Sequence, residues 1–387
     1  MKTRFINGNT LQLLTNGAAY FMALEQAIDT ARNIVPLETY IFADDETGRR
    51  IAAALTRAAK RGVTVRVLVD GFGSNKIFDI IRRQLLSDKV QVLIYHPKIS
   101  PFTMSRNRLR RLHRKLVMID CHLAFIGGIN IIDDMNSPGD LPTRYDYAVR
   151  IEGPLLGTLV RENERLWNRI ALLNFKLEWR IRPLPIPQAV ASGKQRAALV
   201  VRDNLRHRFD IEDAYLDAIN RAQKEIIIVN AYFFPGKRFR RTLRLAAGRG
   251  VRVILLLQGR MEYALLHYAS RALYGAFLDA GVEIYNYRKS LMHAKVGVID
   301  GQWSTVGSSN IDPFSLLLAR EANVIVDDSQ FAEELHASLR QHIEDGALKV
   351  DQDSWYGQPL WRRIINWSAY GVARLLLGLA GLRSKSY

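Results

Sequence analysis

The chain has 387 residues, more than one hydrophobic core usually organises, so we expect two domains or lobes. Hydrophobic residues make up 48% of the chain and charged residues 24%, a composition that excludes a disordered protein. The net charge of +17 predicts a polyanionic partner, and nucleic acid and anionic lipid fit that charge about equally well.

The single cysteine, Cys121, excludes an internal disulfide and a cysteine-based metal site, and it fits a reducing compartment. The N-terminal stretch MKTRFINGNTLQLLTNG lacks the apolar core of a signal peptide. No uninterrupted apolar run approaches the roughly 20 residues that a membrane-spanning helix needs. We therefore expect a soluble or peripheral protein that, if it binds a membrane, lies on its surface.

The chain then repeats one order of elements. The first half predicts a helix over 16–33, a strand over 34–42, and a basic helix and strand over 48–71; the second predicts the same order over 209–225, 226–234 and 239–259. Helices that alternate with continuous apolar runs predict buried, mostly parallel strands covered by helices. The segment 180–195 contains Pro183, Pro185 and Pro187, which excludes a central strand or helix interior and indicates a connection.

One polar motif occurs at matching places in the two halves. LHRKLVMID contains His113, Lys115 and Asp120, and LMHAKVGVID contains His293, Lys295 and Asp300, each 180 residues later. The same offset relates Gly127 to Gly307 and Asn130 to Asn310. A pair of edge strands with polar tips would be a purely structural explanation, but a repeated spacing of His, Lys and Asp favours a functional one.

The spacing suits phosphate chemistry. Residues i and i+2 of a strand share a face, so each His and its Lys point the same way. The ammonium group neutralises phosphoryl oxygens while the imidazole attacks phosphorus or handles a proton. Two such units around a pseudo-twofold axis would place two His and two Lys at one phosphodiester and give a bell-shaped pH profile. A metal site is disfavoured because lysine is not a usual ligand.

The motif H-x-K-x-x-x-x-D followed by G-G/S-x-N, present twice, resembles the phospholipase D superfamily. The stretches ETYIFADDETGRR, RYDYAVRIEGPL, NAYFFP and NIDPFSLLLAREANV are similar to its bacterial cardiolipin synthase branch. The similarity runs from residue 11 to about Asp327. The fold it implies is α/β, with duplicated phospholipase D-like lobes, mixed and largely parallel sheets flanked by helices, and one shared active site on a pseudo-twofold axis.

The resemblance also implies roles for individual residues. The candidate catalytic set is His113, Lys115, Asp120, His293, Lys295 and Asp300, with the histidines as nucleophile and general acid and the lysines on phosphate. Within this set we expect Asp120 and Asp300 to have a structural role, tying strand ends to neighbouring backbone. Family precedent favours His113 as the nucleophile, which the sequence itself does not decide.

Further positions surround this set. Asn130, Asn310 and Ser308 are the expected phosphate-binding residues, and Gly128 stands where the second half has Ser308, so the half-sites differ. The family carries an acidic residue roughly thirty positions after each motif histidine that orients its ring. Asp146, 33 residues after His113, and Glu321, 28 after His293, match those places. No metal and no other cofactor is implied.

Three features favour lipid over nucleic acid as the partner. The tail 358–387 has apolar residues at helical spacing with tryptophans and a basic component, which suits a helix lying in a membrane interface, although a terminal helix packed on the core would show the same spacing. The basic stretch 96–115 could hold an anionic headgroup, or could be a solvated charged loop. The stretch 264–287 matches the family's acyl-chain region, or an ordinary core helix.

These observations predict an N-terminal lobe over 1–182, a connection over 183–195, a C-terminal lobe over 196–350 and an amphipathic membrane-interface segment over 351–387. The family resemblance implies a phosphatidyltransferase that forms cardiolipin and glycerol from two phosphatidylglycerol molecules through a covalent phosphatidyl-histidine, and we expect it at the cytoplasmic face of a bacterial membrane. Nucleic acid is not the expected partner, and the oligomeric state stays open. The alternatives are a phospholipase D-type hydrolase, a nuclease and a non-enzymatic basic membrane scaffold.

Overall fold

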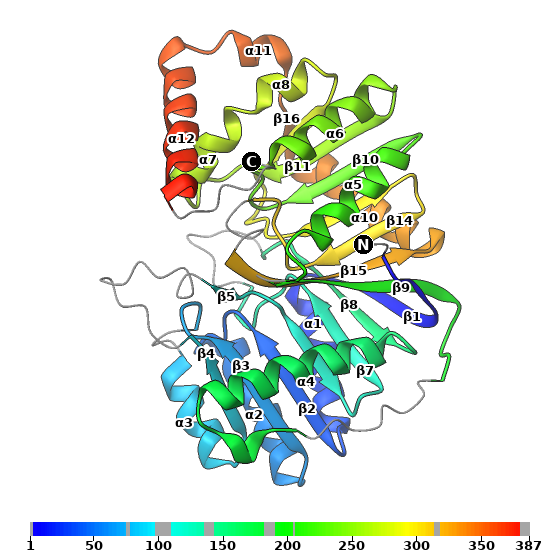
Figure 1. The fold of residues 1–387 in the computed structure, drawn as a ribbon, viewed down its shortest axis with the longest axis vertical. Helices are drawn as coiled ribbons and strands as arrows, with labels where there is room; N and C mark the ends of the chain where they lie inside the picture. The colour runs from blue at the N-terminus through cyan, green and yellow to red at the C-terminus, as the bar shows by residue number, and fades with distance from the viewer. Residues whose placement is uncertain are drawn as a thin grey trace.

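The fold is α/β, with one mixed sheet that runs through both halves of the chain (Figure 1). The computed structural model describes residues 3–74, 78–96, 110–134, 143–181, 190–203, 206–312 and 318–379. The strands within these ranges form a 16-stranded sheet. The α/β prediction is therefore confirmed.

The two halves contain similar elements in the same order, with two exceptions. The first half consists of β1 (Ile6–Thr15), α1 (Asn16–Thr30), β2 (Ile34–Thr39), α2 (Glu46–Lys60), β3 (Thr64–Asp70), α3 (Asp79–Ser87), β4 (Gln91–Tyr95), β5 (Arg111–Leu112), β6 (Leu116–Ile119), β7 (Leu123–Gly127), β8 (Tyr147–Glu152) and α4 (Leu156–Leu173), followed by η3 (Leu177–Trp179). The second consists of β9 (Gln195–Arg202), α5 (Asp210–Arg221), β10 (Glu225–Asn230), α6 (Lys237–Gly248), β11 (Arg252–Gln258), α7 (Ala264–Arg271), α8 (Tyr274–Leu278), β12 (Glu283–Tyr287), β13 (Lys295–Ile299), β14 (Trp303–Gly307), β15 (Ala319–Asp327) and α10 (Ser329–Gly346). β5 has no matching strand among the described residues of the second half, and α7 and α8 stand where the first half has α3.

Strand order repeats as well. The first half of the sheet runs β1-β8-β7-β6-β2-β3-β4, and the second runs β9-β15-β14-β13-β10-β11-β12, which is the same order position by position. β1 pairs with β8 of its own half and with β9 of the other half. The equivalent strands β1 and β9 therefore join the two halves of the sheet. The duplication inferred from the sequence is thus a duplication of topology.

The expectation of largely parallel strands is wrong. Parallel pairing occurs within β2-β3-β4, within β10-β11-β12 and between the short β5 and β15. The other ladders of the described sheet are antiparallel. The reason is local, because the motif strands β6 and β13 each turn back through a tight hairpin instead of a crossover helix. Asp120 and Cys121 have φ values of 49° and 59°, and Asp300 and Gly301 have 53° and 63°, as a type I′ turn requires.

The basic helices α2 and α6 end in the same way. Gly62 and Gly250 have φ values of 91° and 88°, a left-handed conformation that glycine adopts without strain. The amide of the following residue in each case, Val63 or Val251, donates to a carbonyl five residues back. Both helices therefore close with the same C-terminal cap.

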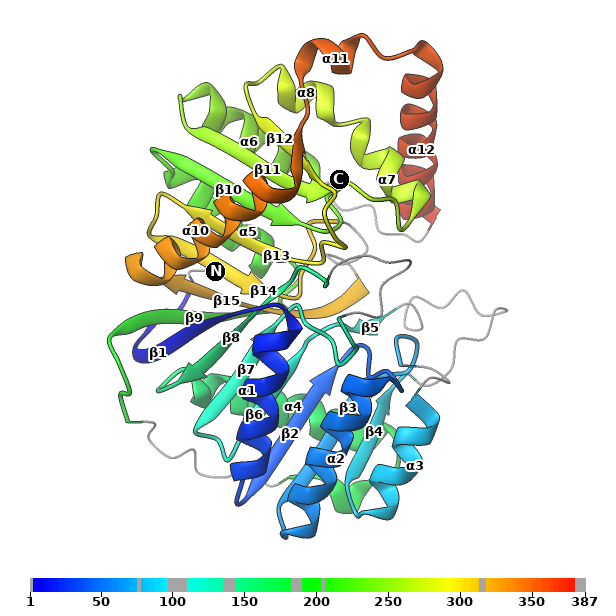
Figure 2. The ribbon, with the colours of Figure 1, turned by 180° about the vertical axis from the view of Figure 1, so that it is seen from behind.

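Helices cover both faces of the sheet. In the first half α1, α2 and α3 lie on the face seen in Figure 2 and α4 lies on the face seen in Figure 1. In the second half the faces are exchanged, with α5 and α6 seen in Figure 1 and α10 in Figure 2. A twofold relation between the halves produces this exchange.

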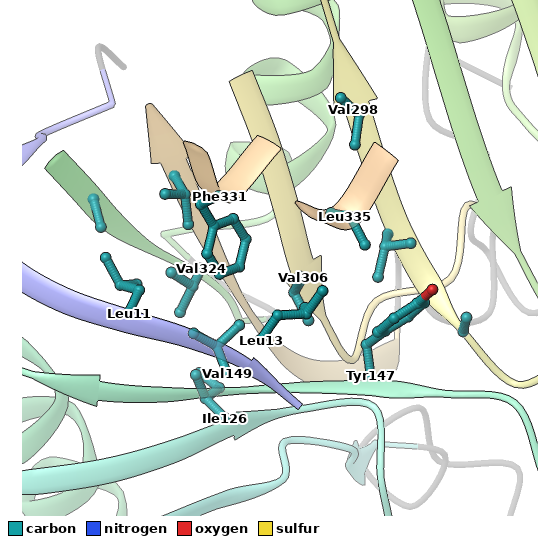
Figure 3. Close-up of a cluster of buried hydrophobic side chains, with 14 of the residues drawn as sticks. Leu11, Leu13, Ile126, Tyr147, Val149, Val298, Val306, Val324, Phe331 and Leu335 are labelled. Carbon is teal, nitrogen blue, oxygen red and sulfur yellow. The ribbon is translucent and has the colours of Figure 1, made fainter. Parts of the chain in front are cut away.

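The halves share one hydrophobic core. A cluster of buried side chains includes Leu11 and Leu13 of β1, Val149 of β8, Val324 of β15 and Phe331 of α10, so it draws on both halves (Figure 3). This shared core fixes how the two motif strands sit relative to each other. The exact lobe boundaries stay a prediction, since residues 182–189, with the three prolines, lie outside the described residues.

The chain continues beyond α10 into β16 (Ala347–Lys349), α11 (Gln352–Tyr356) and α12 (Leu360–Leu379). β16 extends the sheet beside β12, and α12 packs against α7 at the edge of the second half (Figure 1). The tail predicted as an amphipathic helix is therefore helical over its described part.

A buried ion pair supports the first motif from behind. The Arg114 guanidinium donates to both carboxylate oxygens of Glu38 at 2.8 Å, and the Asn163 amide of α4 donates to the same carboxylate at 2.7 Å. Arg114 lies between His113 and Lys115, so its side chain takes the opposite face of the extended chain. The network links the first motif to β2 and to α4.

Replacing Glu38 with Ala would leave the buried Arg114 charge unpaired. We expect the free energy of unfolding to fall by about 3 to 5 kcal/mol, measured by chemical denaturation. Arg165→Ala, which breaks a surface ion pair with Glu162, is the control and should leave the unfolding transition unchanged. An unfolding transition of Glu38→Ala that coincides with the native one would contradict this role.

Candidate active site

The two motif histidines are held by backbone of the opposite half. The amide of His113 donates to the Arg320 carbonyl at 2.9 Å, and the amide of His293 donates to the Tyr145 carbonyl at 2.8 Å. Just before His113, β5 pairs with β15, and Met292, just before His293, forms a bridge with Tyr145. Each motif is therefore placed by the half to which it does not belong.

Equivalent side chains of β3 and β11 anchor the residue that precedes each histidine. Asp70, at the end of β3, accepts from the Leu112 amide at 2.7 Å. Gln258, at the end of β11, donates to the Met292 carbonyl at 3.2 Å. Both side chains are buried, so the approach to each motif is fixed at the carboxyl ends of parallel strands.

The carboxylates pair with the histidines in a crossed manner. His113 Nδ1 lies 3.0 Å from Oε2 of Glu321, and His293 Nδ1 lies 2.7 Å from Oδ2 of Asp146. Family resemblance assigned each carboxylate to the histidine that precedes it in the chain, and the structure corrects that pairing. The exchange follows from the twofold relation, because each carboxylate lies at the junction facing the other half.

The crossed pairs determine which ring nitrogen is available. The partners of His113 Nδ1 are the Glu321 carboxylate and, at 3.1 Å, the Ser308 carbonyl, and both are acceptors. Nδ1 therefore carries the proton, and in the neutral ring the lone pair is on Nε2. The Asp146 carboxylate imposes the same tautomer on His293. The side chains of His113 and His293 are 15% and 17% exposed, so each ring keeps an edge open to a ligand.

Both motif lysines lie in the same buried centre. Lys115 Nζ donates to the His113 carbonyl at 2.8 Å, and Lys295 Nζ donates to the His293 carbonyl. Burial lowers the pKa of Lys115 to about 7 and that of Lys295 to about 8. Lys295 adds to the decrease in the pKa of Lys115, which places the lysines of the two halves within interaction range of each other.

Burial and neighbouring cations also act on the histidines. Burial lowers the pKa of His113 and takes that of His293 well below its ordinary value. Both lysines contribute to each decrease, whereas Glu321 opposes the decrease for His113. Burial raises the pKa of Asp146 to about 6. Two histidines, two lysines and two carboxylates thus form one electrostatic unit built from both halves.

The motif aspartates lie away from this unit and hold the backbone. Asp120 accepts from the amides of Arg32, Asn33 and Ile34 at 2.7 to 2.8 Å. Asp300 accepts from the amides of Gln223, Lys224 and Glu225 at 2.8 to 3.0 Å. Desolvation acts to raise the pKa of Asp120, but the three amides hold it below the ordinary value. These contacts fit the structural role expected for Asp120 and Asp300. They do not fit a catalytic role for either residue.

The expected phosphate-binding residues divide into two groups. Asn130 and Asn310 are buried next to the motifs, and the Asn310 amide oxygen has no hydrogen-bond partner among the described residues. The Asn130 oxygen accepts from the Ile41 amide at 3.2 Å, so its NH₂ group is the side that could reach a phosphate. The Ser308 hydroxyl instead donates to Glu321 at 2.5 Å. Ser308 therefore positions Glu321, which corrects its predicted contact with phosphate.

The Gly128–Ser308 difference matches the difference between the carboxylates. A Cβ atom on Gly128 would lie 2.2 Å from Oδ1 of Asp146, so the short aspartate occupies the space that a side chain would take. In the second half the longer Glu321 leaves room for Ser308 and binds its hydroxyl. The two half-sites thus hold their carboxylates, and through them the histidines, in different ways.

Tyr40 is a site residue that the sequence reasoning missed. Its ring packs edge-to-face on His113 with centroids 4.9 Å apart, and Lys115 Nζ lies 5.6 Å from its centroid. Tyr232 is the equivalent residue of the second half, because the stretch NAYFF there aligns with ETYIF in the first half. This alignment of the two halves could have identified Tyr40 as a site residue. Across the described parts of the chain no group of three or more His, Cys, Asp or Glu side chains is placed to hold a metal ion.

Comparisons with known proteins find related chains and a related fold. The sequence profile described as "Cardiolipin synthase, PLD-like domain" matches residues 24–167 and 215–343. The chain is 39% identical over 382 residues to "Cardiolipin synthase B" of Shigella flexneri and to that of Escherichia coli (strain K12), covering 98% of this chain and 92% of each relative. A solved phosphatidylserine synthase of Haemophilus influenzae has the same fold, with a TM-score of 0.70 and 15% identity over 95% of this chain and 94% of that one.

Replacing Gly128 with Ala should push the Asp146 carboxylate away from His293. We expect turnover of a phosphodiester to fall about 10- to 100-fold, since residues that orient a functional histidine have effects of that size. Gly248→Ala, at a position with open space around it, is the matched control and should turn over at the native rate. Native turnover by Gly128→Ala would show that the Asp146–His293 contact is dispensable.

Proposed function

The chain belongs to the cardiolipin synthase branch of the phospholipase D superfamily, and on that premise we propose that it joins two phosphatidylglycerol molecules into cardiolipin and glycerol. The observation that carries the proposal is the crossed pairing of His113 with Glu321 and of His293 with Asp146. This pairing presents two imidazoles of fixed tautomer to one lysine-lined centre. Such a centre suits a single phosphodiester, with one imidazole on each side of phosphorus.

The first displacement forms a phosphatidyl-histidine. Nε2 of His113 attacks phosphorus, the P–N bond forms, and the P–O bond to the glycerol headgroup breaks. His293 donates a proton to the departing alkoxide. The phosphodiester anion offsets the charges of Lys115 and Lys295, so its binding favours the protonated imidazole that this step needs. The choice of His113 as nucleophile follows family precedent.

The second displacement reverses these roles. His293, now neutral, accepts a proton from a hydroxyl of a second phosphatidylglycerol, whose oxygen forms a bond to phosphorus while the P–N bond breaks. The NH₂ group of Asn130 is suited to hold a phosphoryl oxygen during both steps. A water molecule in place of the lipid hydroxyl would give phosphatidic acid and make the enzyme a hydrolase.

Lipid substrates require the protein to reach a membrane surface, and α12 suits that task. Its inner side packs on the second half through buried Ala373 and Leu377, and Tyr370 lies against Phe234 with ring centroids 5.5 Å apart. Its outer side leaves a row of large apolar residues exposed: Trp361, Ile364, Ile365, Val372, Leu375 and Leu376. A helix with a second, open apolar side is what membrane insertion in the interface plane needs.

Within the described residues no helix is both long enough and apolar enough to cross a membrane. We infer peripheral binding through α12, with the net charge of +17 attracting anionic lipid instead of nucleic acid. The single cysteine and the anionic inner leaflet support the cytoplasmic face. The basic loop proposed to meet the headgroup lies largely in 97–109, outside the described residues, as does the end of the tail from 380 onward.

Purified protein given vesicles of labelled phosphatidylglycerol should produce cardiolipin and glycerol. His113→Ala and His293→Ala should each lower the rate at least about 1000-fold, because each removes one partner of a two-step displacement. His336→Ala, whose ring contacts Glu225 outside the site, is the matched control and should keep the native rate. Phosphatidic acid without cardiolipin would contradict transfer, and full activity of the histidine variants would contradict the site.

Membrane docking is tested by the double variant Ile364→Glu/Leu375→Glu. Both side chains are exposed on the outer side of α12, 65% and 62%, so we expect vesicle binding to fall at least tenfold without loss of folding. Flotation with phosphatidylglycerol-containing vesicles measures this. Leu245→Glu, on α6 and 53% exposed, is the control and should bind as the native chain does. Equal binding by the double variant would exclude α12 as the docking helix.

A further inference from the structure

A cavity lies on one side of the catalytic centre, between the ends of β10 and β11 and the helix α7. The cavity is open to solvent. Apolar side chains of Leu257 and Leu266 form part of its wall, and Tyr232, Glu262 and His267 supply polar groups. This mixture of apolar wall and a few polar groups is typical of a small-molecule subsite.

The cavity adjoins the second motif directly. Ala231, which lines it, donates its amide to the carbonyl of Ala294, the residue between His293 and Lys295. Gln258, also in the lining, holds the carbonyl of Met292 at 3.2 Å. The Glu262 carboxylate opposes the burial effect that lowers the pKa of Lys295, so the two groups interact electrostatically. The cavity wall is therefore continuous with the backbone on both sides of His293.

The polar groups of the cavity suit hydroxyl groups. The Tyr232 hydroxyl donates to the Glu262 carboxylate, whose remaining lone pairs can accept from ligand hydroxyls. Burial, with help from Arg271, lowers the pKa of His267 to about 4, so this ring is neutral at neutral pH. Arg260 also lines the cavity, so the lining carries one positively and one negatively charged side chain. A neutral polyol meets both donors and acceptors there without adding net charge.

All the residues that line the cavity belong to the second half of the chain. In the first half Tyr40, the counterpart of Tyr232, lies over His113 and Lys115, where it forms part of the catalytic centre itself. Tyr232 instead turns to Glu262 and its ring meets that of Tyr263, with centroids 5.5 Å apart. The two equivalent tyrosines thus serve different purposes, and the duplicated site has one side that can receive a second ligand group.

We propose that this cavity binds the glycerol headgroup of the acceptor phosphatidylglycerol, with Glu262 and Tyr232 as its hydroxyl-binding residues; the inference rests on the proposed function. The headgroup hydroxyl that points to the centre passes its proton to Nε2 of His293. Its oxygen forms a bond to phosphorus as the bond between phosphorus and Nε2 of His113 breaks. The glycerol released in the first displacement leaves on this same side. The helix α7, which packs against the membrane-docking α12, places the cavity next to the lipid surface.

Exchange of free labelled glycerol into phosphatidylglycerol vesicles tests the proposal. The readouts are labelled phosphatidylglycerol, formed by attack of glycerol on the intermediate, and phosphatidic acid, formed by attack of water. We expect Glu262→Gln and Tyr232→Phe each to raise the apparent KM for glycerol about tenfold, as the loss of a hydrogen bond to a charged group does. The share of phosphatidic acid among the products should rise. Glu344→Gln, an exposed carboxylate on α10 outside the cavity lining, is the matched control.

The outcomes separate the two proposals. A native chain that exchanges glycerol while both variants keep the native KM would overturn the assignment of the cavity and leave the proposed function standing. A native chain that forms neither cardiolipin nor labelled phosphatidylglycerol would overturn the proposed function itself. If labelled ethanolamine is incorporated better than glycerol, and Glu262→Gln impairs its use more, the cavity binds a cationic headgroup and the glycerol assignment is wrong.

Discussion

The whole structure depends on burying cations close to one another at the junction of the halves. Removing a charged group from water costs several kcal/mol, and two lysines beside two imidazoles repel each other as well. Asp146 and Glu321 offset this cost, because they bring two negative charges to the same centre and hold each imidazole through Nδ1. Since each carboxylate comes from the half opposite its histidine, neither half has a complete site alone. The shared core and the joined sheet are what keep the crossed pairs aligned.

The duplication makes the fold symmetric, whereas the reaction requires the two halves of the site to differ. Nucleophile and proton donor must differ in protonation during each step, and lipid transfer needs room for an alcohol on one side of phosphorus. The structure differs between the halves in the surroundings of both histidines. Glu321 with Ser308 holds one ring, whereas Asp146 against Gly128 holds the other. Tyr40 covers His113, while its counterpart Tyr232 lines a cavity beside His293. These differences explain how a symmetric fold can catalyse an asymmetric reaction.

Much of this could be predicted from the sequence, and the failures have physical causes. The matched offset of His113 and His293 gave the duplication, and helical and strand periodicities gave α1, α2, β2, β3 and their counterparts. We overestimated the share of parallel strands in the sheet. Helices separate only the first strands of each half, whereas the motif strands form hairpins. The crossed pairing of Asp146 and Glu321 could not be read from spacing, because it depends on how the halves meet. Ser308 was misassigned for the same reason, since its partner Glu321 is placed by the tertiary fold. Tyr40 was missed although its alignment with Tyr232 was visible.

A crystal structure of the protein with orthovanadate tests the central claim most directly, because vanadate takes up the geometry of phosphorus in the displacement. We expect one vanadium atom between the motifs, bonded to Nε2 of His113, with Nε2 of His293 within about 3 Å of the opposite apical oxygen. Lys115 and Lys295 should both contact its equatorial oxygens. Two vanadates bound separately, one at each motif, would contradict the account, and so would one vanadate that contacts a single half.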